Sequence, residues 1–318
     1  MSIRVAINGF GRIGRLSLRA LLESKRDDFE IIAINDLGPL ETNTHLFKYD
    51  SAHGIVNAEV RHDDEHMIIN DHKIRYFSKE NPQDLPWGAL NIDIVFECTG
   101  RFVAREDSEK HLLAGAKKVL ISAPGKDADI TVVYGLNHHT LKADHKIVSN
   151  ASCTTNCLAP VADVLNKTVG IVKGYMTSVH SYTGDQPTID RVHRDLRRAR
   201  SAGVSIIPTS TGAAKAVGLV LPELLGKLDG CALRVPTQNV SLVDLTFEAA
   251  RMTTEEEINQ AIIDASQGRF KGILGAYDQE LVSIDFNHNP NSSSFDLTQT
   301  KVMEGNLVRV LSWYDNEW

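Results

Sequence analysis

The first half of the chain alternates short apolar runs with longer amphipathic ones. Apolar runs at residues 3–7 and 30–34 flank a helical pattern at residues 13–22. Further runs typical of buried strands occupy residues 92–97, 119–122, 130–134 and 147–148. Such alternation is typical of a parallel, doubly wound sheet covered by helices. We therefore predict an α/β domain over residues 1–150.

From about residue 170 the pattern changes to longer runs in which apolar and polar residues alternate. These runs occupy residues 174–182, 232–235, 240–247, 281–286 and 307–313. They indicate an antiparallel sheet with one exposed face. Thr254 and Glu257 form a capping-box pattern that opens a helix, and another helical run, 213–220, stops before Pro222. This change of pattern predicts a second, α+β domain over residues 151–318.

Composition restricts the class of protein. The chain has 318 residues, of which 42% are hydrophobic and 24% charged, which excludes wholesale disorder. It carries 34 Lys and Arg against 41 Asp and Glu, a formal charge of -7, so we do not expect nucleic acid or anionic lipid as a partner. No apolar run is long enough to cross a membrane, and Met1 leads directly into a strand without a signal sequence. We expect a cytoplasmic protein.

Glycines mark the turn after the first strand. Residues 9–14 read Gly-Phe-Gly-Arg-Ile-Gly, between a strand and a helix. Gly9, Gly11 and Gly14 allow a tight turn and close approach of a pyrophosphate to the helix N-terminus. The second strand ends at Asp36, whose carboxylate can bind ribose hydroxyls and would repel a 2′-phosphate. The pattern predicts an NAD site; the alternative is a packing turn with Asp36 as a cap.

Cys153 lies in a polar segment between an apolar strand and a helical run. Ser152 is a plausible N-cap, which places Cys153 in the first helical turn. Free N–H groups and the helix dipole there favour the thiolate and can stabilise an oxyanion. We interpret Cys157, one turn deeper, as a buried small residue. The spacing of these two cysteines lacks the usual CxxC pattern, and no second ligand pair is evident, so we expect no metal.

A cysteine nucleophile requires a base. His180 ends an apolar run and precedes a polar loop, a position suited to a site at a strand end. The chain has 12 histidines, and spacing alone does not distinguish His180 from the others.

Several ordered motifs resemble the phosphorylating glyceraldehyde-3-phosphate dehydrogenase family along essentially the whole chain. The Ser-Cys-Thr-Thr-Asn-Cys segment at residues 152–157 is the most specific. The other matching stretches are residues 6–15, 180–183, 195–200, 207–215, 234–237 and 313–318. The resemblance implies a Rossmann-like NAD-binding domain, a catalytic domain with a mixed, mostly antiparallel sheet, and a homotetramer. It also implies a closing helix after Trp318, which lies outside this sequence.

The family resemblance implies a role for each matching residue. Cys153 would be the nucleophile and His180 its base, in NAD-dependent oxidation of glyceraldehyde 3-phosphate with inorganic phosphate to 1,3-bisphosphoglycerate, in glycolysis or gluconeogenesis. The implied cofactor contacts beyond the glycines are Arg12, Ile13, Asp36, Lys79, Ser122 and Asn316. The implied contacts of substrate and phosphate are Ser152, Thr154, Thr183, Arg198, Thr211, Gly212 and Arg234. Hydroxyls, N–H groups and arginine forks suit phosphate oxygens.

Two features of the sequence depart from the family pattern. Lys79 stands where arginine is more usual, and residues 186–192 lack the Leu-Pro pair of many NAD-specific members. The exclusion of NADP therefore depends on Asp36.

Three other functions remain open at this point. Erythrose-4-phosphate dehydrogenase shares the cysteine segment but tends to lack the pair that Thr211 and Gly212 form here. A Cys-His hydrolase is a second alternative, but it would not need a dinucleotide-binding glycine turn. A nucleic-acid patch could use the arginines between residues 191 and 200, with His193, but the acidic chain favours a loop that binds phosphate and neighbouring subunits.

Overall fold

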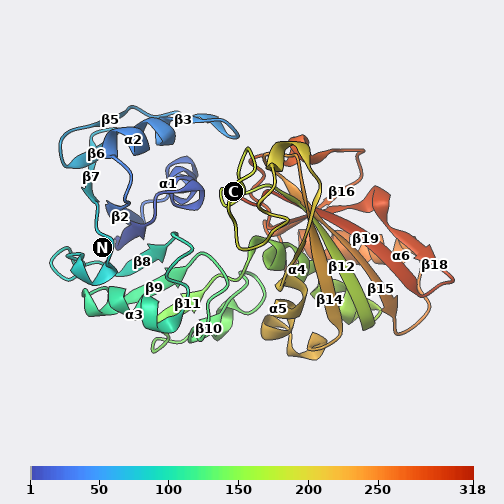
Figure 1. Ribbon diagram of the computed structural model, residues 1–318. Coiled ribbons are helices and arrows are strands. Elements are labelled where there is room, and N and C mark those ends of the chain that lie inside the picture. The colour runs from blue at the N-terminus through green and yellow to red at the C-terminus, as the bar shows by residue number, and fades with distance from the viewer. Residues whose placement is uncertain (1) are drawn as a thin grey trace. The chain divides into compact units, whose positions relative to one another are not determined.

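The computed structural model describes residues 2–318, which form two compact units (Figure 1). The first unit extends to Val132 and includes Thr140–Ala151 and Trp318. The second comprises Val133–His139 and Ser152–Glu317. The sequence did not indicate that residues 133–139 belong to the second unit. They do so because Gly135 packs so closely on Ile273 that a Cβ there would lie 2.3 Å from the Ile273 side chain.

A nine-stranded sheet forms the first unit, in the order β10-β11-β9-β8-β1-β2-β7-β6-β5. Its strands are β1 (Ile3–Asn8), β2 (Phe29–Asn35), β5 (Val60–His62), β6 (His66–Ile69), β7 (His72–Phe77), β8 (Ile94–Glu97), β9 (Lys118–Ile121), β10 (Ile130–Thr131) and β11 (Ile147–Ser149). The helices are α1 (Arg12–Ser24), α2 (Leu40–Lys48) and α3 (Arg105–Leu113), and a hairpin joins β3 (Tyr49–Asp50) to β4 (Gly54–Ile55).

The pairing from β10 through β7 is parallel, as the alternating pattern predicts. Val5 and Ile7 pack in one apolar cluster and Ala6 in another, so β1 is buried on both faces. The antiparallel edge of β5, β6 and β7 was not predicted. Its short strands carry polar residues on exposed positions, which gives a weak hydrophobic pattern.

An eight-stranded mixed sheet forms the second unit, in the order β13-β14-β12-β15-β19-β17-β16, with β18 on β19. Its strands are β12 (Ile171–Ser181), β13 (Ile207–Ser210), β14 (Leu228–Val235), β15 (Ser241–Ala249), β16 (Leu274–Tyr277), β17 (Ser293–Asp296), β18 (Lys301–Met303) and β19 (Leu307–Tyr314). Its helices are α4 (Cys153–Thr168), α5 (Ala213–Val220) and α6 (Glu255–Gln267). Most pairs are antiparallel, and α4 packs on β17 and β19, so the predicted fold class is confirmed.

The prediction of a strand at residues 281–286 is wrong. The segment forms a short 3-10 helix, Ser283–Phe286, in which the Asp285 carboxylate accepts a hydrogen bond of 2.8 Å from the Val282 N–H. Only Phe286 enters the core, while Val282 and Ile284 stay exposed. A local side-chain hydrogen bond has therefore prevailed over the alternating pattern.

The remaining short helices have 3-10 geometry: Pro82–Asp84, His138–Thr140, Ala202–Val204, Pro222–Leu224 and Leu297–Gln299. Among residues 2–318, no helix combines the length and apolar character that crossing a bilayer requires.

Candidate active site

The three glycines of the turn after β1 have different surroundings. Gly9 has a φ of +89°, and a Cβ there would lie 2.7 Å from the Thr99 nitrogen. A Cβ on Gly14 would lie 2.2 Å from the Gly9 carbonyl oxygen. Gly11 has no atom within 4 Å of a Cβ position. The first and last glycines are therefore needed for folding, whereas Gly11 leaves open the space through which a pyrophosphate would approach.

The N-terminus of α1 fits an anion. Gly11 is its N-cap, and within the described chain no side chain caps this end and no acidic residue occupies the first turn. An anion can therefore approach this helix end without displacing a capping side chain. The Arg12 side chain turns to Asp50, with 2.5 Å between Nη1 and Oδ2. Burial alone would raise the pKa of Asp50, but Arg12 and two backbone N–H groups lower it to about 2.

Asp36 joins the glycine turn to the loop after β2. Its carboxylate accepts hydrogen bonds from the Phe10 N–H at 2.7 Å, the Gly38 N–H at 2.8 Å and the Asn43 amide at 3.1 Å. It is half-buried, so an exposed part remains for ribose hydroxyls. The carboxylate thus holds the turn in shape and supplies the negative charge that disfavours a 2′-phosphate.

A buried polar network supports the strand ends below the turn. The Asn35 amide donates to Asn8 Oδ1 at 2.7 Å, and the Asn8 amide donates to Glu97 Oε2 at 2.6 Å. Asn35 also holds the backbone of Lys79 through two hydrogen bonds, while the Lys79 side chain is exposed. The Ser122 hydroxyl donates to the Glu97 carbonyl at 3.1 Å. This network was not predicted. The sequence does contain a signal for it, because Glu97, at the end of the apolar run 92–97, is a carboxylate that needs hydrogen-bond partners when buried.

In the second unit, Cys153 opens α4 and faces His180 at the end of β12. The distance from Cys153 Sγ to His180 Nε2 is 3.5 Å. His180 Nδ1 lies 2.7 Å from the carbonyl oxygen of Ser181, so Nδ1 carries the proton and donates it. This tautomer leaves the Nε2 lone pair directed at the thiol, which is the arrangement that a general base requires.

Desolvation acts on the pKa values of both groups. Burial raises the pKa of the Cys153 thiol, against the opposing effects of Thr154 and Arg234. Burial also lowers the pKa of His180 to about 4, and the positive charge of Arg234 acts in the same direction. The prediction that the helix N-terminus favours the thiolate omitted desolvation, which raises the pKa of the thiol and acts in the opposite direction. The thiolate has to form as His180 accepts the proton.

The start of α4 fixes the position of the cysteine. Ser152 is the N-cap, and its hydroxyl accepts from the Thr155 N–H at 3.1 Å. Ala151 before it has a φ of +56°, a conformation that L residues rarely adopt. Thr154 Oγ1 lies 2.7 Å from the Tyr314 hydroxyl. Cys157 is fully buried, which raises the pKa of its thiol to about 12.

Two arginines create positive charge next to His180. Arg234 Nη1 donates to the Ser181 carbonyl and to the Thr183 hydroxyl, each at 3.0 Å. Burial and the charge of Arg198 both lower the pKa of Arg234. Its buried Nε has no hydrogen-bond partner among the described residues. Arg198 is paired with two carboxylates, Asp185 at 3.2 Å and Asp195 at 3.9 Å, so it is the unpartnered Nε of Arg234 that offers a donor to an anion.

The other predicted phosphate contacts lie beyond β13. Thr211 Oγ1 accepts from the Ala213 N–H at 3.2 Å, and Gly212 is the N-cap of α5 with open space around it. Asn316 lies after β19, and its Oδ1 accepts from the Ser241 hydroxyl at 2.7 Å. The second unit therefore contains Cys153, His180, Asn316 and all seven predicted phosphate contacts.

Within residues 2–318, no three side chains of His, Cys, Asp or Glu form a group that could hold an ion.

Comparison with known proteins identifies the family. Residues 3–105 match the model of the glyceraldehyde 3-phosphate dehydrogenase NAD binding domain, and residues 152–316 match the C-terminal domain of the same family. Glyceraldehyde-3-phosphate dehydrogenase of Xanthobacter flavus is 64% identical over 318 residues, covering all of this chain and 95% of that protein. The enzymes of Cereibacter sphaeroides and Pseudomonas aeruginosa are 60% and 58% identical, again over all of this chain and 95% of theirs.

The chain belongs to the glyceraldehyde-3-phosphate dehydrogenase family. The resemblance drawn from the sequence is thereby confirmed.

The sequence analysis did not identify Tyr314 as a residue of the active site. Its buried hydroxyl lies 2.7 Å from Thr154 Oγ1 and 3.0 Å from Ser178 Oγ, and its ring meets His180 edge to face. Burial raises the pKa of Tyr314 well above its ordinary value, so it stays protonated. The residue belongs to a quoted motif, but only its place on β19 brings it to the cysteine.

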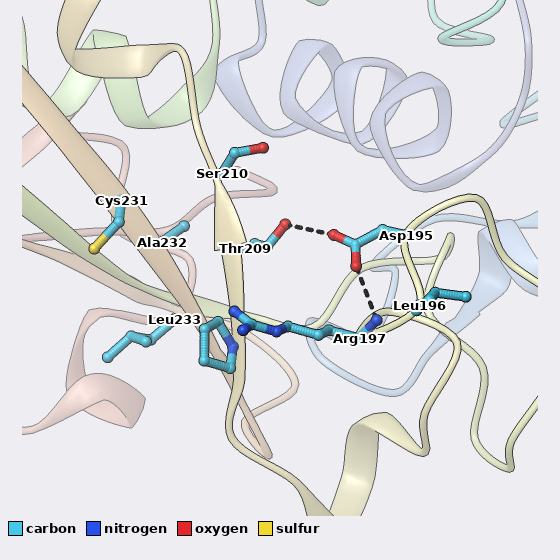
Figure 2. A pocket seen from close by; sticks show the side chains of 9 residues that line it. Asp195, Leu196, Arg197, Thr209, Ser210, Cys231, Ala232 and Leu233 are labelled. Atoms are coloured by element: carbon cyan, nitrogen blue, oxygen red, sulfur yellow. Dashed lines mark hydrogen bonds between the residues drawn. The ribbon is translucent and has the colours of Figure 1, made fainter.

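A pocket outside the predicted contacts lies beside β13 and β14 (Figure 2). Figure 2 shows the Asp195 carboxylate between the Thr209 hydroxyl and the backbone nitrogen of Arg197. Thr209 in turn accepts a hydrogen bond from Arg198 Nε at 3.1 Å. The edge strand β13 thus holds Arg198 in place through the hydroxyl of Thr209.

Proposed function

We propose that this chain catalyses the NAD-dependent, phosphorylating oxidation of D-glyceraldehyde 3-phosphate to 1,3-bisphosphoglycerate, in glycolysis or gluconeogenesis. The observation that carries the proposal is the contact between Cys153 Sγ and the unprotonated Nε2 of His180 at a helix N-terminus. Family membership and the match to an NAD binding domain supply the rest.

The chemistry follows from this pair. His180 Nε2 accepts the thiol proton as the sulfur attacks the aldehyde carbon, and returns it to the oxygen to give a thiohemiacetal. The same nitrogen removes the hydroxyl proton while the carbon is oxidised to a thioester on Cys153. NAD, when bound, takes up the two electrons and the hydrogen released from carbon. Inorganic phosphate then displaces the sulfur, which leaves as thiolate and regains its proton from His180.

We propose that both phosphate groups bind to the second unit. The contacts would be Ser152, Thr154, Thr183, Arg198, Thr211, Gly212 and Arg234. The buried, unpartnered Nε of Arg234 supports this role, because a guanidinium can bind two phosphate oxygens at once.

The proposed cofactor contacts begin with the glycine turn and α1. They are Gly9, Gly11, Arg12, Ile13, Gly14, Asp36, Lys79, Ser122 and Asn316. The open space at Gly11, the uncapped helix and the placed carboxylate of Asp36 fit a dinucleotide with free ribose hydroxyls. We accordingly assign residues 1–150 to cofactor binding and residues 151–318 to catalysis.

We further propose a homotetramer that works in the cytoplasm. Segment 189–206 exposes Ile189, Val192, Leu196, Val204 and Ile206, each with more than two thirds of its surface accessible, which suits burial against another copy. All four cysteines are free, as a catalytic thiol in a reducing compartment requires.

One assay tests the proposal. NADH formation is followed by absorbance with glyceraldehyde 3-phosphate, with and without phosphate, and with NADP in place of NAD. We expect a phosphate-dependent rate with NAD, and a lower rate with erythrose 4-phosphate. Ester cleavage without NADH formation would instead support a hydrolase.

A further inference from the structure

A chain of hydrogen bonds connects the proposed base to Asn316. His180 Nδ1 donates to the Ser181 carbonyl at 2.7 Å. The N–H of Ser181 donates to Ser241 Oγ at 3.0 Å, and the Ser241 hydroxyl donates to Asn316 Oδ1 at 2.7 Å. Ser241 is therefore the only side chain in this path between His180 and Asn316.

The sheet places Ser241 between the two residues. Strand β15, which Ser241 opens, lies between β12 with His180 and β19, after which Asn316 follows. Ser241 pairs with Tyr314 across β15 and β19. With 1% of its surface exposed, the serine has little access to water, so its one proton is committed to Asn316.

The backbone next to Ser241 is strained. Val240 has a φ of +69°, a conformation that is a clear outlier for a β-branched residue. The Ser181 hydroxyl holds it there by donating to the Val240 carbonyl at 2.9 Å. Asn239 is held in turn by donating to Asn287 Oδ1 at 2.8 Å. Such strain persists where the surrounding contacts enforce it, and it is concentrated at functional sites.

The direction of the last hydrogen bond decides how Asn316 presents its amide. Because Oδ1 accepts from Ser241, the NH₂ group points the other way and is presented as a donor. Asp315 holds the backbone around Asn316 by accepting from the N–H groups of His288 at 2.7 Å and Glu317 at 3.0 Å. The backbone is thus fixed by Asp315 and the side-chain amide by Ser241.

We propose that Ser241 is a positioning residue for the reaction: its hydroxyl selects the Asn316 amide orientation that binds the nicotinamide carboxamide, and fixes it to the strand end that carries His180. The inference rests on the proposed function, because it takes Asn316 to be the nicotinamide contact. Without the hydroxyl, the Asn316 amide can turn over and present its oxygen instead.

The test compares two ligands that differ only in the nicotinamide. Ser241→Ala should weaken NAD binding about fivefold to tenfold, the equivalent of one hydrogen bond, and leave ADP-ribose binding unchanged. Titration calorimetry on the full chain measures both dissociation constants. In steady-state kinetics, KM for NAD should rise and KM for the aldehyde should not. An equal loss for both ligands, or no loss for NAD, would overturn the proposal.

Further variants separate positioning from stability. Ser241→Cys fills nearly the same volume with a weak donor and should give the same split between ligands, even where Ser241→Ala folds poorly. In an Asn316→Ala background, Ser241→Ala should have no further effect on NAD, whereas additive losses would contradict the coupling. Ser293→Ala, which removes a buried 2.8 Å bond to Ser312 in the same sheet, is the control and should affect neither ligand.

Failure of the proposed function would be visible separately. A wild-type chain that binds NAD but forms no NADH from the aldehyde and phosphate would refute the activity alone. The contrast between NAD and ADP-ribose would still decide the role of Ser241.

Discussion

The glycine turn of the first unit and the cysteine site of the second prepare for their ligands in different ways. At the turn, the ligand-facing groups are backbone N–H groups, and Gly9 and Gly14 serve the packing that holds them. At the cysteine, side chains from α4, β12 and β14 meet in a buried place where pKa values shift. Binding at the turn therefore depends on shape, whereas reactivity at Cys153 depends on desolvation and on the position of single protons.

The largest effect is expected from Cys153→Ala. Turnover should fall on the order of 10⁴-fold or more, because no other group can form the thioester. NAD binding should be unchanged, since the glycine turn lies in the other unit. NADH formation and calorimetry measure the two properties. Cys231→Ala, which removes another free thiol, is the control and should retain turnover. Retained turnover in Cys153→Ala would refute the mechanism.

His180→Asn tests the proton transfer by itself. The asparagine amide can still donate to the Ser181 carbonyl but offers no base to Cys153. We expect kcat to fall roughly 10²-fold to 10⁴-fold, with little change in the dissociation constant of NAD. A variant with unchanged kcat would show that water or another group removes the proton.

The same histidine should make stability depend on pH. Unfolded His180 binds a proton below its ordinary pKa of 6.5, whereas the folded residue binds it only below about 4. The unfolded state therefore binds more protons in this window, and the free energy of unfolding should fall by roughly 3 kcal/mol as the pH decreases through it.

Urea unfolding at several pH values, in wild type and His180→Asn, measures this contribution. Between about pH 6.5 and pH 4, the free energy of unfolding of the variant should change less steeply with pH than that of wild type, because residue 180 no longer titrates. His62→Asn, in an exposed strand of the first unit, should keep the wild-type slope. Identical slopes in wild type and His180→Asn would contradict the buried, neutral state of the base.

The smallest expected effect distinguishes two glycines of the turn. Gly11→Ala adds a methyl group in open space, so stability should be unchanged while NAD binding weakens about tenfold by obstruction of the pyrophosphate. Gly14→Ala pushes a methyl group against the Gly9 carbonyl and should cost about 1–3 kcal/mol of stability. Urea unfolding and calorimetry on both variants provide the comparison. Equal stability losses would show that Gly11 also serves packing.

Much of the first site could be predicted from sequence because its parts are contiguous. The strand, turn and helix at residues 3–24 follow from apolar periodicity and from glycines that alone tolerate the local geometry. The N-cap at Ser152 was predictable for the same reason, since a capping side chain bonds within its own turn. The 3-10 helix at residues 283–286 was not, because one local hydrogen bond outweighed an apolar pattern.

The sequence by itself determined the order of elements, the glycine turn and the helix start that carries Cys153, because these depend on interactions between near neighbours. Only the tertiary structure decided that His180 faces that cysteine, that Tyr314 and Ser241 adjoin the pair, and that desolvation raises the pKa of the thiol. Those facts depend on strands far apart in the chain becoming neighbours in one sheet, and on how completely their packing removes water from each charge.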